Sequence, residues 1–168
     1  MIRPEQAEDL NSVRRVHESA FPTAAEARLV ETLRANGKAV VSLVAEVDGR
    51  VVAHILFSPA TIEGNSRACA GLGLAPVAVL PEFQNRGVGS QLIREGLDRC
   101  RQIGCGFVIV LGHPSYYLRF GFRRASEYGL TNEYAVDDPF MAIELAPGAL
   151  PPEGGLARYA PEFAEMGE

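Results

Sequence analysis

Between Leu72 and Gly104 the hydrophobic pattern changes from a continuous apolar run to positions spaced as on one face of a helix. The run over residues 72–80 is short and bounded by glycine and proline, which favours a strand buried on both faces. After a glycine-containing turn, the apolar positions recur at helical spacing. They are Val88, Leu92, Gly96, Leu97, Cys100 and Ile103. The pattern therefore predicts a strand, a turn and a helix that ends at Gly104.

The N-terminal part of the sequence predicts two helices. The first is expected over residues 3–20, before the break at Pro22. The second is expected to open at a capping box of Thr23 and Glu26 and to end at Asn36-Gly37. The apolar positions that predict their inner faces are Leu10, Val13, Val16, Ala20, Ala27, Leu29, Val30 and Leu33.

A hairpin and a buried strand follow these helices. Residues 39–47 and 50–62 have strand patterns and are joined by Asp48-Gly49, a dipeptide typical of a tight hairpin. The segment Glu63-Gly-Asn-Ser66 is then expected to turn the chain into the strand over 72–80. We therefore predict an antiparallel meander that leads to a central strand.

The C-terminal part predicts further strands. Residues 106–111 form a second buried strand, parallel to the first because a helix connects the two. Residues 115–122 are expected to form a short helix running into a strand that starts at Phe120. Residues 141–145 predict one more strand, and residues 155–159 a last edge strand after a loop rich in proline and glycine.

The glycine turn after residue 80 has a chemical use. Its two glycines lack a Cβ and leave amide groups approachable at the start of a helix, where the helix dipole favours an anion such as a pyrophosphate. Arg86 adds a positive charge, and the Gln84 side chain can fix the orientation of the turn. The residues of this turn are Gln84, Asn85, Arg86, Gly87, Val88, Gly89 and Ser90. Neither G-x-x-x-x-G-K-[ST] nor G-x-G-x-x-G is present here.

The spacing Val77-x-Val79-x-Pro81-x-x-Gln84-x-x-Gly87-x-Gly89 closely resembles the acetyl-coenzyme A motif of the GNAT superfamily of N-acyltransferases. The resemblance covers nearly the whole chain, and residues 112–122 (GHPSYYLRFGF) look most like the YhbS-like bacterial branch. It implies a single N-acetyltransferase domain over residues 1–168. The implied fold is α/β (α+β), with a mixed central sheet of about six or seven strands, a splayed parallel pair and about four flanking helices.

The resemblance also implies roles for particular residues, with acetyl-CoA as the co-substrate and no metal. The backbone of Val77, Ala78 and Val79 would hold the pantetheine arm, and the Val79 N–H would bond the thioester carbonyl. Pro76 marks the place where this strand parts from its neighbour. Tyr117, four residues before Gly121 of a Gly-Phe pair, would be the general acid.

Two features near Tyr117 leave alternatives open. The adjacent Tyr116 competes for the role of general acid, although the family position favours Tyr117. The asparagine that many members of the superfamily carry just after the fifth strand is absent, and His113 and Pro114 occupy that region instead. A role for His113 therefore stays open.

Acyl transfer to an amine also requires a neutral nucleophile. An alkyl amine with a pKa of about 10.4 is only about one part in 2,500 neutral at pH 7, so burial or a base must remove its proton. Five side chains are candidates, and a chain of water molecules is another, so no base is assigned. The side chains are Glu26, Glu46, His54, Glu82 and His113. His17, at the edge of the first helix stripe, is expected to be a partly buried or surface residue rather than a catalytic one.

Two functions of different class are compatible with these features. One is an acyl-CoA-dependent N-acetyltransferase, and the other is a non-catalytic acyl-CoA-binding sensor or regulatory module. Tyr117 favours catalysis. The acceptor, a small-molecule or protein amine, is not identified, because acceptor groups in this fold lie on the loop at about residues 20–25 and on the C-terminal loop.

Composition and charge limit the expected location and partners of the protein. The chain has 168 residues, 47% of them hydrophobic, with no apolar run long enough to span a bilayer. The N-terminus lacks the apolar region of a signal peptide, so we expect a bacterial cytoplasmic protein that needs no membrane partner. The net charge of −5 argues against nucleic-acid binding. Cys69, Cys100 and Cys105 lack metal-binding spacing and are expected to be buried in a reducing compartment, and a homodimer stays open.

Overall fold

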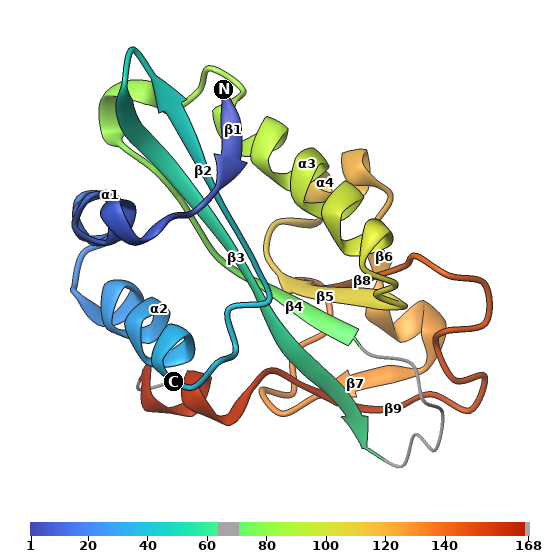
Figure 1. Cartoon of the computed structure of the whole chain (residues 1–168). Helices are drawn as coiled ribbons and strands as arrows, with labels where there is room; N and C mark the ends of the chain where they lie inside the picture. The colour runs from blue at the N-terminus through green and yellow to red at the C-terminus, as the bar shows by residue number, and fades with distance from the viewer. Residues whose placement is uncertain (64–70, 167–168) are drawn as a thin grey trace. The chain divides into compact units, whose positions relative to one another are not determined.

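The computed structural model describes residues 1–63 and 71–166 (Figure 1). The chain divides into two compact units: a first unit of residues 1–57, 75–99 and 162–168, and a second unit of residues 58–74 and 100–161. Strands β3 (Arg50–Glu63) and β4 (Gly71–Val79) run through both units. The described residues contain nine strands in one mixed sheet and four α-helices. The predicted fold class is confirmed, although the strand number exceeds the expected six or seven.

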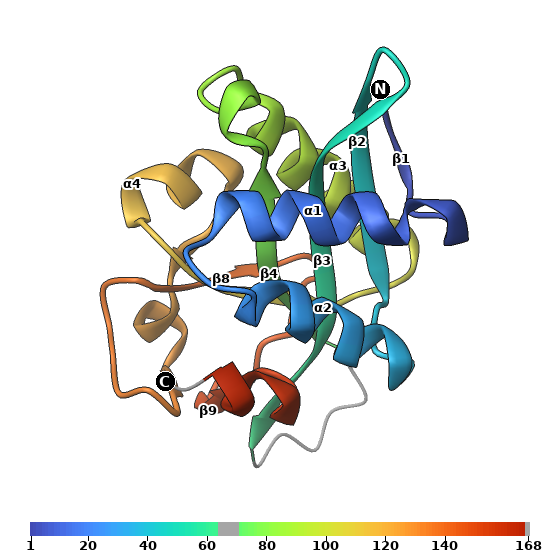
Figure 2. The ribbon, with the colours of Figure 1, turned by 90° about the vertical axis from the view of Figure 1, so that its left-hand side faces the viewer.

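The first unit is built on an antiparallel arrangement of β1 (Ile2–Pro4), β2 (Val41–Val47) and the first part of β3. The predicted hairpin is confirmed, with φ of 51° at Asp48 and 77° at Gly49, the positive values that a tight two-residue turn requires. The helices α1 (Leu10–Ala20) and α2 (Ala25–Ala35) lie over one face of these strands (Figure 2).

The helix α3 (Val88–Gln102) packs on the opposite face of these strands from α1 and α2 (Figure 2). Gly96 lies directly against the ring of Phe57 on β3, so closely that a Cβ at this position would overlap the ring. Phe57 and His54, which contacts α1, point to opposite faces of β3 because side chains alternate along a strand. The strands are therefore buried on both sides, as the continuous apolar run of β3 indicates.

In the second unit, β4 pairs in parallel with β5 (Phe107–Leu111), as predicted, and β5 pairs with β8 (Phe140–Glu144). The short β6 (Arg123–Arg124) joins the far side of β8. The other strands of this unit are β7 (Leu130–Asn132) and β9 (Gly155–Arg158), with α4 (Pro114–Tyr117) following β5. The strand predicted at 155–159 forms as β9, but it pairs with both β3 and β7, so its predicted position at an edge is wrong.

The prediction that the first helix starts at residue 3 is also wrong, because α1 begins at Leu10. Residues 2–4 form β1, and a short 3-10 turn over residues 7–9 precedes α1. Arg3 pairs with Asp9 at 2.7 Å and with Glu46 at 2.9 Å, which ties this segment to β2. Ionic contacts and strand pairing thus outweigh the helical pattern of residues 3–9.

Several side chains differ from their predicted environment. Leu10 and Ile103 were expected on inner faces but are 40% and 57% exposed, because Leu10 opens α1 and Ile103 lies beyond the end of α3. The capping box does not form, because Ala24 is the cap residue of α2 and Glu26 lies too early in the helix. Cys100 and Cys105 are buried as expected, whereas Cys69 and the turn residues 64–66 lie outside the described residues.

Candidate active site

The glycine turn, residues 84–90, connects a 3-10 turn (Pro81–Phe83) to α3 in the first unit. Asn85 and Gly87 have φ of 63° and 82°, in the left-handed region that favours glycine. The Gly87 carbonyl accepts a hydrogen bond from the Gln91 amide at 3.0 Å and so begins the helix. The amides of a first helical turn have no partner on a preceding turn, and the helix dipole favours a negative charge beside them.

Charged side chains gather at this turn around Phe83. The guanidinium carbons of Arg86 and Arg50 lie 5.6 and 5.9 Å from the centre of its ring, distances at which a cation is attracted to an aromatic face. Arg50 also pairs with Glu82 at 3.3 Å. The positive charge of Arg86 is therefore held over Phe83, in the 3-10 turn that precedes the glycine turn.

The carboxyl end of β4 is fixed by two hydrogen bonds in the first unit. The Leu80 amide donates to the Val52 carbonyl of β3 at 2.9 Å, and the Gln84 side chain donates to the Val79 carbonyl at 3.0 Å. Because successive amides of a strand point to opposite sides, the Val79 N–H points away from β3. Gln84 thus links the glycine turn to the strand whose backbone was predicted to hold the cofactor.

Tyr159 occupies the place in the second unit where the parallel pair parts. The pairing of β4 with β5 covers Gly71 to Gly73 and does not continue along the described part of β4. Beyond it, the Tyr159 hydroxyl accepts a hydrogen bond from the Leu111 amide at 3.1 Å and donates one to the Leu74 carbonyl at 3.4 Å. The splayed pair is confirmed, and the parting begins after Gly73, before Pro76 is reached.

Sequence reasoning missed Tyr159, which it placed only in a possible last strand. A Cβ added at Gly73 would lie 2.5 Å from the Tyr159 ring, so glycine is needed for the tyrosine to fit. Burial is the main reason that the pKa of Tyr159 lies far above its usual range, which keeps the hydroxyl protonated. A glycine inside an apolar strand is a signal of close approach by another group and could have indicated this contact.

Tyr117 lies in α4 of the second unit and is 7% exposed. Its ring makes an edge contact with Phe122 at 5.6 Å, and Gly112 provides the space for it. Burial, with a smaller effect of Tyr116, raises the pKa of Tyr117 to about 12, so the hydroxyl is protonated at pH 7. Tyr116 is half-buried and contacts Tyr117 edge to face at 5.1 Å.

The five candidate bases have different surroundings. Glu46 pairs with Arg3. A hydrogen bond from the backbone amide of Glu82 to its own carboxylate, with a further effect of Arg50, holds the pKa of Glu82 below its usual range. His113 is exposed at the start of α4. Glu26 has one buried carboxylate oxygen without a hydrogen-bond partner among the described residues. His54 is fully buried and hydrogen-bonded.

A mixed sheet with a parted parallel pair, and a glycine turn at a helix start beside one of its strands, define an acetyltransferase of the GNAT class. Residues 1–125 match the family model of the acetyltransferase (GNAT) domain, and the chain belongs to this family. The chain is 40% identical over 137 residues to the N-acetyltransferase YjhQ of Escherichia coli, a match that covers 80% of this chain and 76% of that protein.

Two solved structures are similar over nearly the whole chain. YhbS of Escherichia coli in complex with CoA has a TM-score of 0.90 and 34% identity, covering 98% of this chain and 91% of that one. A GNAT acetyltransferase of Brucella melitensis in complex with acetyl-CoA has a TM-score of 0.80 and 36% identity, covering 97% of each chain. The prediction of a YhbS-like GNAT protein is confirmed.

The described residues contain neither a cluster of metal ligands nor a membrane-spanning helix. Among the side chains that the structure describes, in residues 1–63 and 71–164, no three His, Cys, Asp or Glu gather as metal ligands would. Within the same part of the chain, no helix has the length and hydropathy needed to cross a membrane.

Proposed function

We propose that this protein transfers the acetyl group of acetyl-CoA to a primary amine by direct attack of the amine on the thioester. The observation that carries the proposal is the glycine turn at the start of α3, linked through Gln84 to the Val79 carbonyl. The relatives from E. coli and Brucella melitensis whose structures contain CoA or acetyl-CoA support it.

The residues of the turn fit a pyrophosphate. A Cβ built at Gly87 meets no atom within 4 Å, so the turn is open on that side. The amides of residues 84–90 and the Arg86 guanidinium would bind the phosphate oxygens, since a helix start and a nearby cation both favour an anion.

The backbone of β4 would hold the pantetheine arm. Val77, Ala78 and Val79 form the end of the strand, and the Val79 N–H, directed away from β3, would donate to the thioester carbonyl. A donor aimed at this oxygen stabilises the negative charge that develops on it as the amine attacks.

Tyr117 would protonate the leaving thiolate. As the new C–N bond forms and the C–S bond breaks, the electron pair of that bond stays on sulfur, which takes the phenol proton. The phenolate then regains a proton from water. Protonation of the hydroxyl at pH 7 and its location just after β5 support this role.

Thiol release from acetyl-CoA across a panel of amines tests the proposal. Release that depends on one class of amine, with the acetylated amine identified by mass spectrometry, is the expected result. Tight binding of acetyl-CoA without thiol release for any amine would instead indicate the sensor function. The acceptor found in the panel would show whether a small molecule or a protein is modified.

We also propose that residues 1–168 act as one domain in the bacterial cytoplasm.

A further inference from the structure

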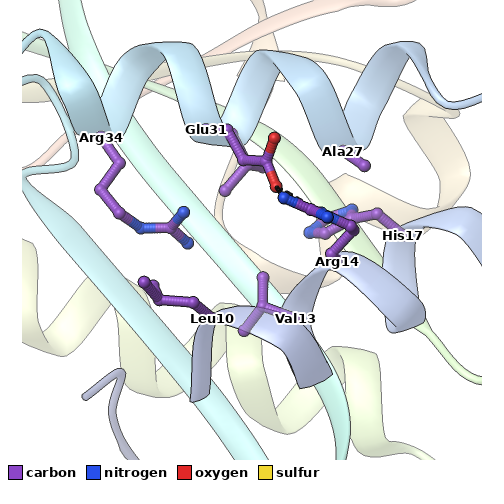
Figure 3. Close-up of a pocket in the computed structure, with 8 residues that line it drawn as sticks. Leu10, Val13, Arg14, His17, Ala27, Glu31 and Arg34 are labelled. Carbon is purple, nitrogen blue, oxygen red and sulfur yellow. Dashed lines mark hydrogen bonds and ion pairs between the residues drawn. The ribbon is translucent and has the colours of Figure 1, made fainter. Parts of the chain in front are cut away.

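The pocket between α1 and α2 in the first unit is lined by charged side chains that pair within the protein (Figure 3). Arg14 pairs with Glu31 at 2.5 Å, and Arg34 pairs with Glu5 at 2.5 Å. Because these charges compensate one another, they do not single out the pocket as a ligand site. In the second unit, by contrast, the buried side chain of Tyr159 lies between two strands that would otherwise bond to each other.

The register of the parallel pair β4 and β5 identifies the hydrogen bond that would come next in the ladder. The last pair of the ladder is Gly73 with Ile109. Two residues further along each strand, Ala75 would lie opposite Leu111. In a parallel ladder, an amide that points at the neighbouring strand bonds the carbonyl of the residue just before the one opposite it. The next bond would therefore join the Leu111 amide to the Leu74 carbonyl.

The Tyr159 hydroxyl lies between these same two backbone groups. It accepts a hydrogen bond from the Leu111 amide at 3.1 Å and donates one to the Leu74 carbonyl at 3.4 Å. A direct backbone bond spans only about 2.9 Å, so the inserted hydroxyl keeps the strands apart where the next bond would draw them together. A phenol hydroxyl donates and accepts at once, so both backbone groups stay satisfied although they do not meet.

The position of the Tyr159 hydroxyl is fixed by the fold of the second unit. Tyr159 directly follows β9, which is paired with both β3 and β7. Its ring lies against Gly73, where an added Cβ would overlap the ring. A water molecule could make the same two hydrogen bonds, but it would be free to exchange with the solvent. The hydroxyl, held through its ring and backbone, is a permanent part of the place where the strands part.

We propose that Tyr159 is a positioning residue for the cofactor, because its hydroxyl replaces one backbone hydrogen bond of the β4–β5 ladder and keeps the strands parted before CoA binds. The inference rests on the proposed function, in which the backbone of β4 holds the pantetheine arm. β4 continues from Leu74 to Val79, the residues proposed to bond that arm. A site that is already open costs less free energy to occupy than one that the ligand has to open.

The variant Tyr159→Phe tests the role of the hydroxyl, since it keeps the ring against Gly73. The Leu111 amide and the Leu74 carbonyl lose their shared partner and can then bond directly, which lengthens the ladder and narrows the parting. CoA has to break this bond in order to bind. We therefore expect the Kd for CoA to rise about 10-fold in isothermal titration, the effect of about one hydrogen bond. At saturating acetyl-CoA, kcat for the best amine of the panel should stay within about 2-fold of the parental value.

Two further variants complete the binding test. Tyr128→Phe is the matched control, because it removes a tyrosine hydroxyl from the short 3-10 turn before β7 and not from the place where the strands part, so it should keep the parental Kd. Gly73→Ala should raise the Kd in the same direction as Tyr159→Phe, because the added Cβ displaces the tyrosine ring and its hydroxyl with it.

NMR of the CoA-free protein gives a second readout that needs no amine acceptor. A scalar coupling between the Leu111 amide nitrogen and the Leu74 carbonyl carbon reports a direct hydrogen bond between them. It should be absent from the parental protein and present in Tyr159→Phe.

Two results would overturn the inference while leaving the proposed function in place: a parental protein that already shows this coupling, or a folded Tyr159→Phe variant with the parental Kd. If the variant loses stability but keeps its Kd, Tyr159 has a structural role only. A parental protein that binds CoA but acetylates no amine would instead overturn the proposed transfer, and a 10-fold rise in Kd in the variant would still support the role of Tyr159 in CoA binding.

Discussion

The glycine turn and a buried histidine chain, made of the hydrogen-bonded side chains of Glu5, Ser42, His54 and His17, are two regions of the same unit that are built in different ways. The turn offers backbone amides at the start of α3, and the residues that shape it are contiguous in the sequence. The histidine chain uses side chains from four segments, which come together only in the folded protein. A site formed by backbone amides can thus be predicted from a short stretch of sequence, whereas a cluster of side chains from distant segments depends on tertiary packing. Variants of each region can test this difference.

The largest effect is expected from Gly87→Val. With φ of 82°, Gly87 has a conformation that a β-branched residue rarely adopts, and the added side chain would also cover the start of α3. We expect affinity for CoA to fall about 100-fold or more in isothermal titration. Gly37→Val is the control, since Gly37 has φ of 72° and open space but lies after α2. Equal losses in both variants would mean that strain alone, and not the phosphate site, is responsible.

The next effect concerns Tyr117→Phe, which keeps the ring against Phe122 and removes only the hydroxyl. Acyl transfer measured before the steady state should be slowed about 100-fold, with unchanged CoA affinity. Tyr116→Phe is the matched control. If both variants react at the parental rate, water protonates the leaving thiolate.

The pH dependence of the acyl-transfer rate above pH 8 is a further test of Tyr117 as the general acid. Because the pKa of Tyr117 is about 12, its hydroxyl keeps its proton at pH 10, where an unperturbed tyrosine would be half ionised. The acyl-transfer rate at saturating amine should therefore show no loss between pH 8 and pH 10. A decline centred near pH 10 would contradict the buried environment of Tyr117.

Stability should depend on pH through His17. Its pKa is about 4 in the folded protein and about 6.5 when unfolded, so the unfolded chain binds more protons between these values. The free energy of unfolding should therefore fall as the pH drops through this window, by about 2 kcal/mol between pH 7 and pH 5 for His17 alone. Urea titrations should show a smaller pH effect in His17→Gln and a parental one in His113→Gln.

The smallest effect is expected from Arg86→Ala. The guanidinium lies beside the glycine turn on Phe83, but the amides of the turn carry most of the proposed phosphate binding. We expect CoA affinity to fall about 5-fold, less at high salt because exposed charges are screened. Arg50→Ala removes the other cation on Phe83 and should leave affinity nearly unchanged. A loss of CoA affinity as large as that of Gly87→Val would mean that the Arg86 side chain, and not the backbone amides, makes the main contribution to phosphate binding.

The sequence predicted the elements that rest on local chemistry. Apolar runs located β4 and β5, Asp48-Gly49 located the hairpin, and the glycine turn located the start of α3. The helical pattern failed over residues 3–9, because the ion pairs of Arg3 and the pairing of β1 with β2 are contacts between distant segments. For the same reason His17, expected to be partly buried or at the surface, is wholly buried.

Tyr159 has a consequence for how the sheet can be observed in solution. Its hydroxyl takes the place of a neighbouring strand by holding the Leu111 amide and the Leu74 carbonyl. An amide at the end of a ladder ordinarily exchanges its hydrogen with water quickly, because the last bonds of a strand open most often. The Leu111 amide should instead exchange slowly, and its exchange rate would report each opening of the tyrosine contact at the place where the two strands part.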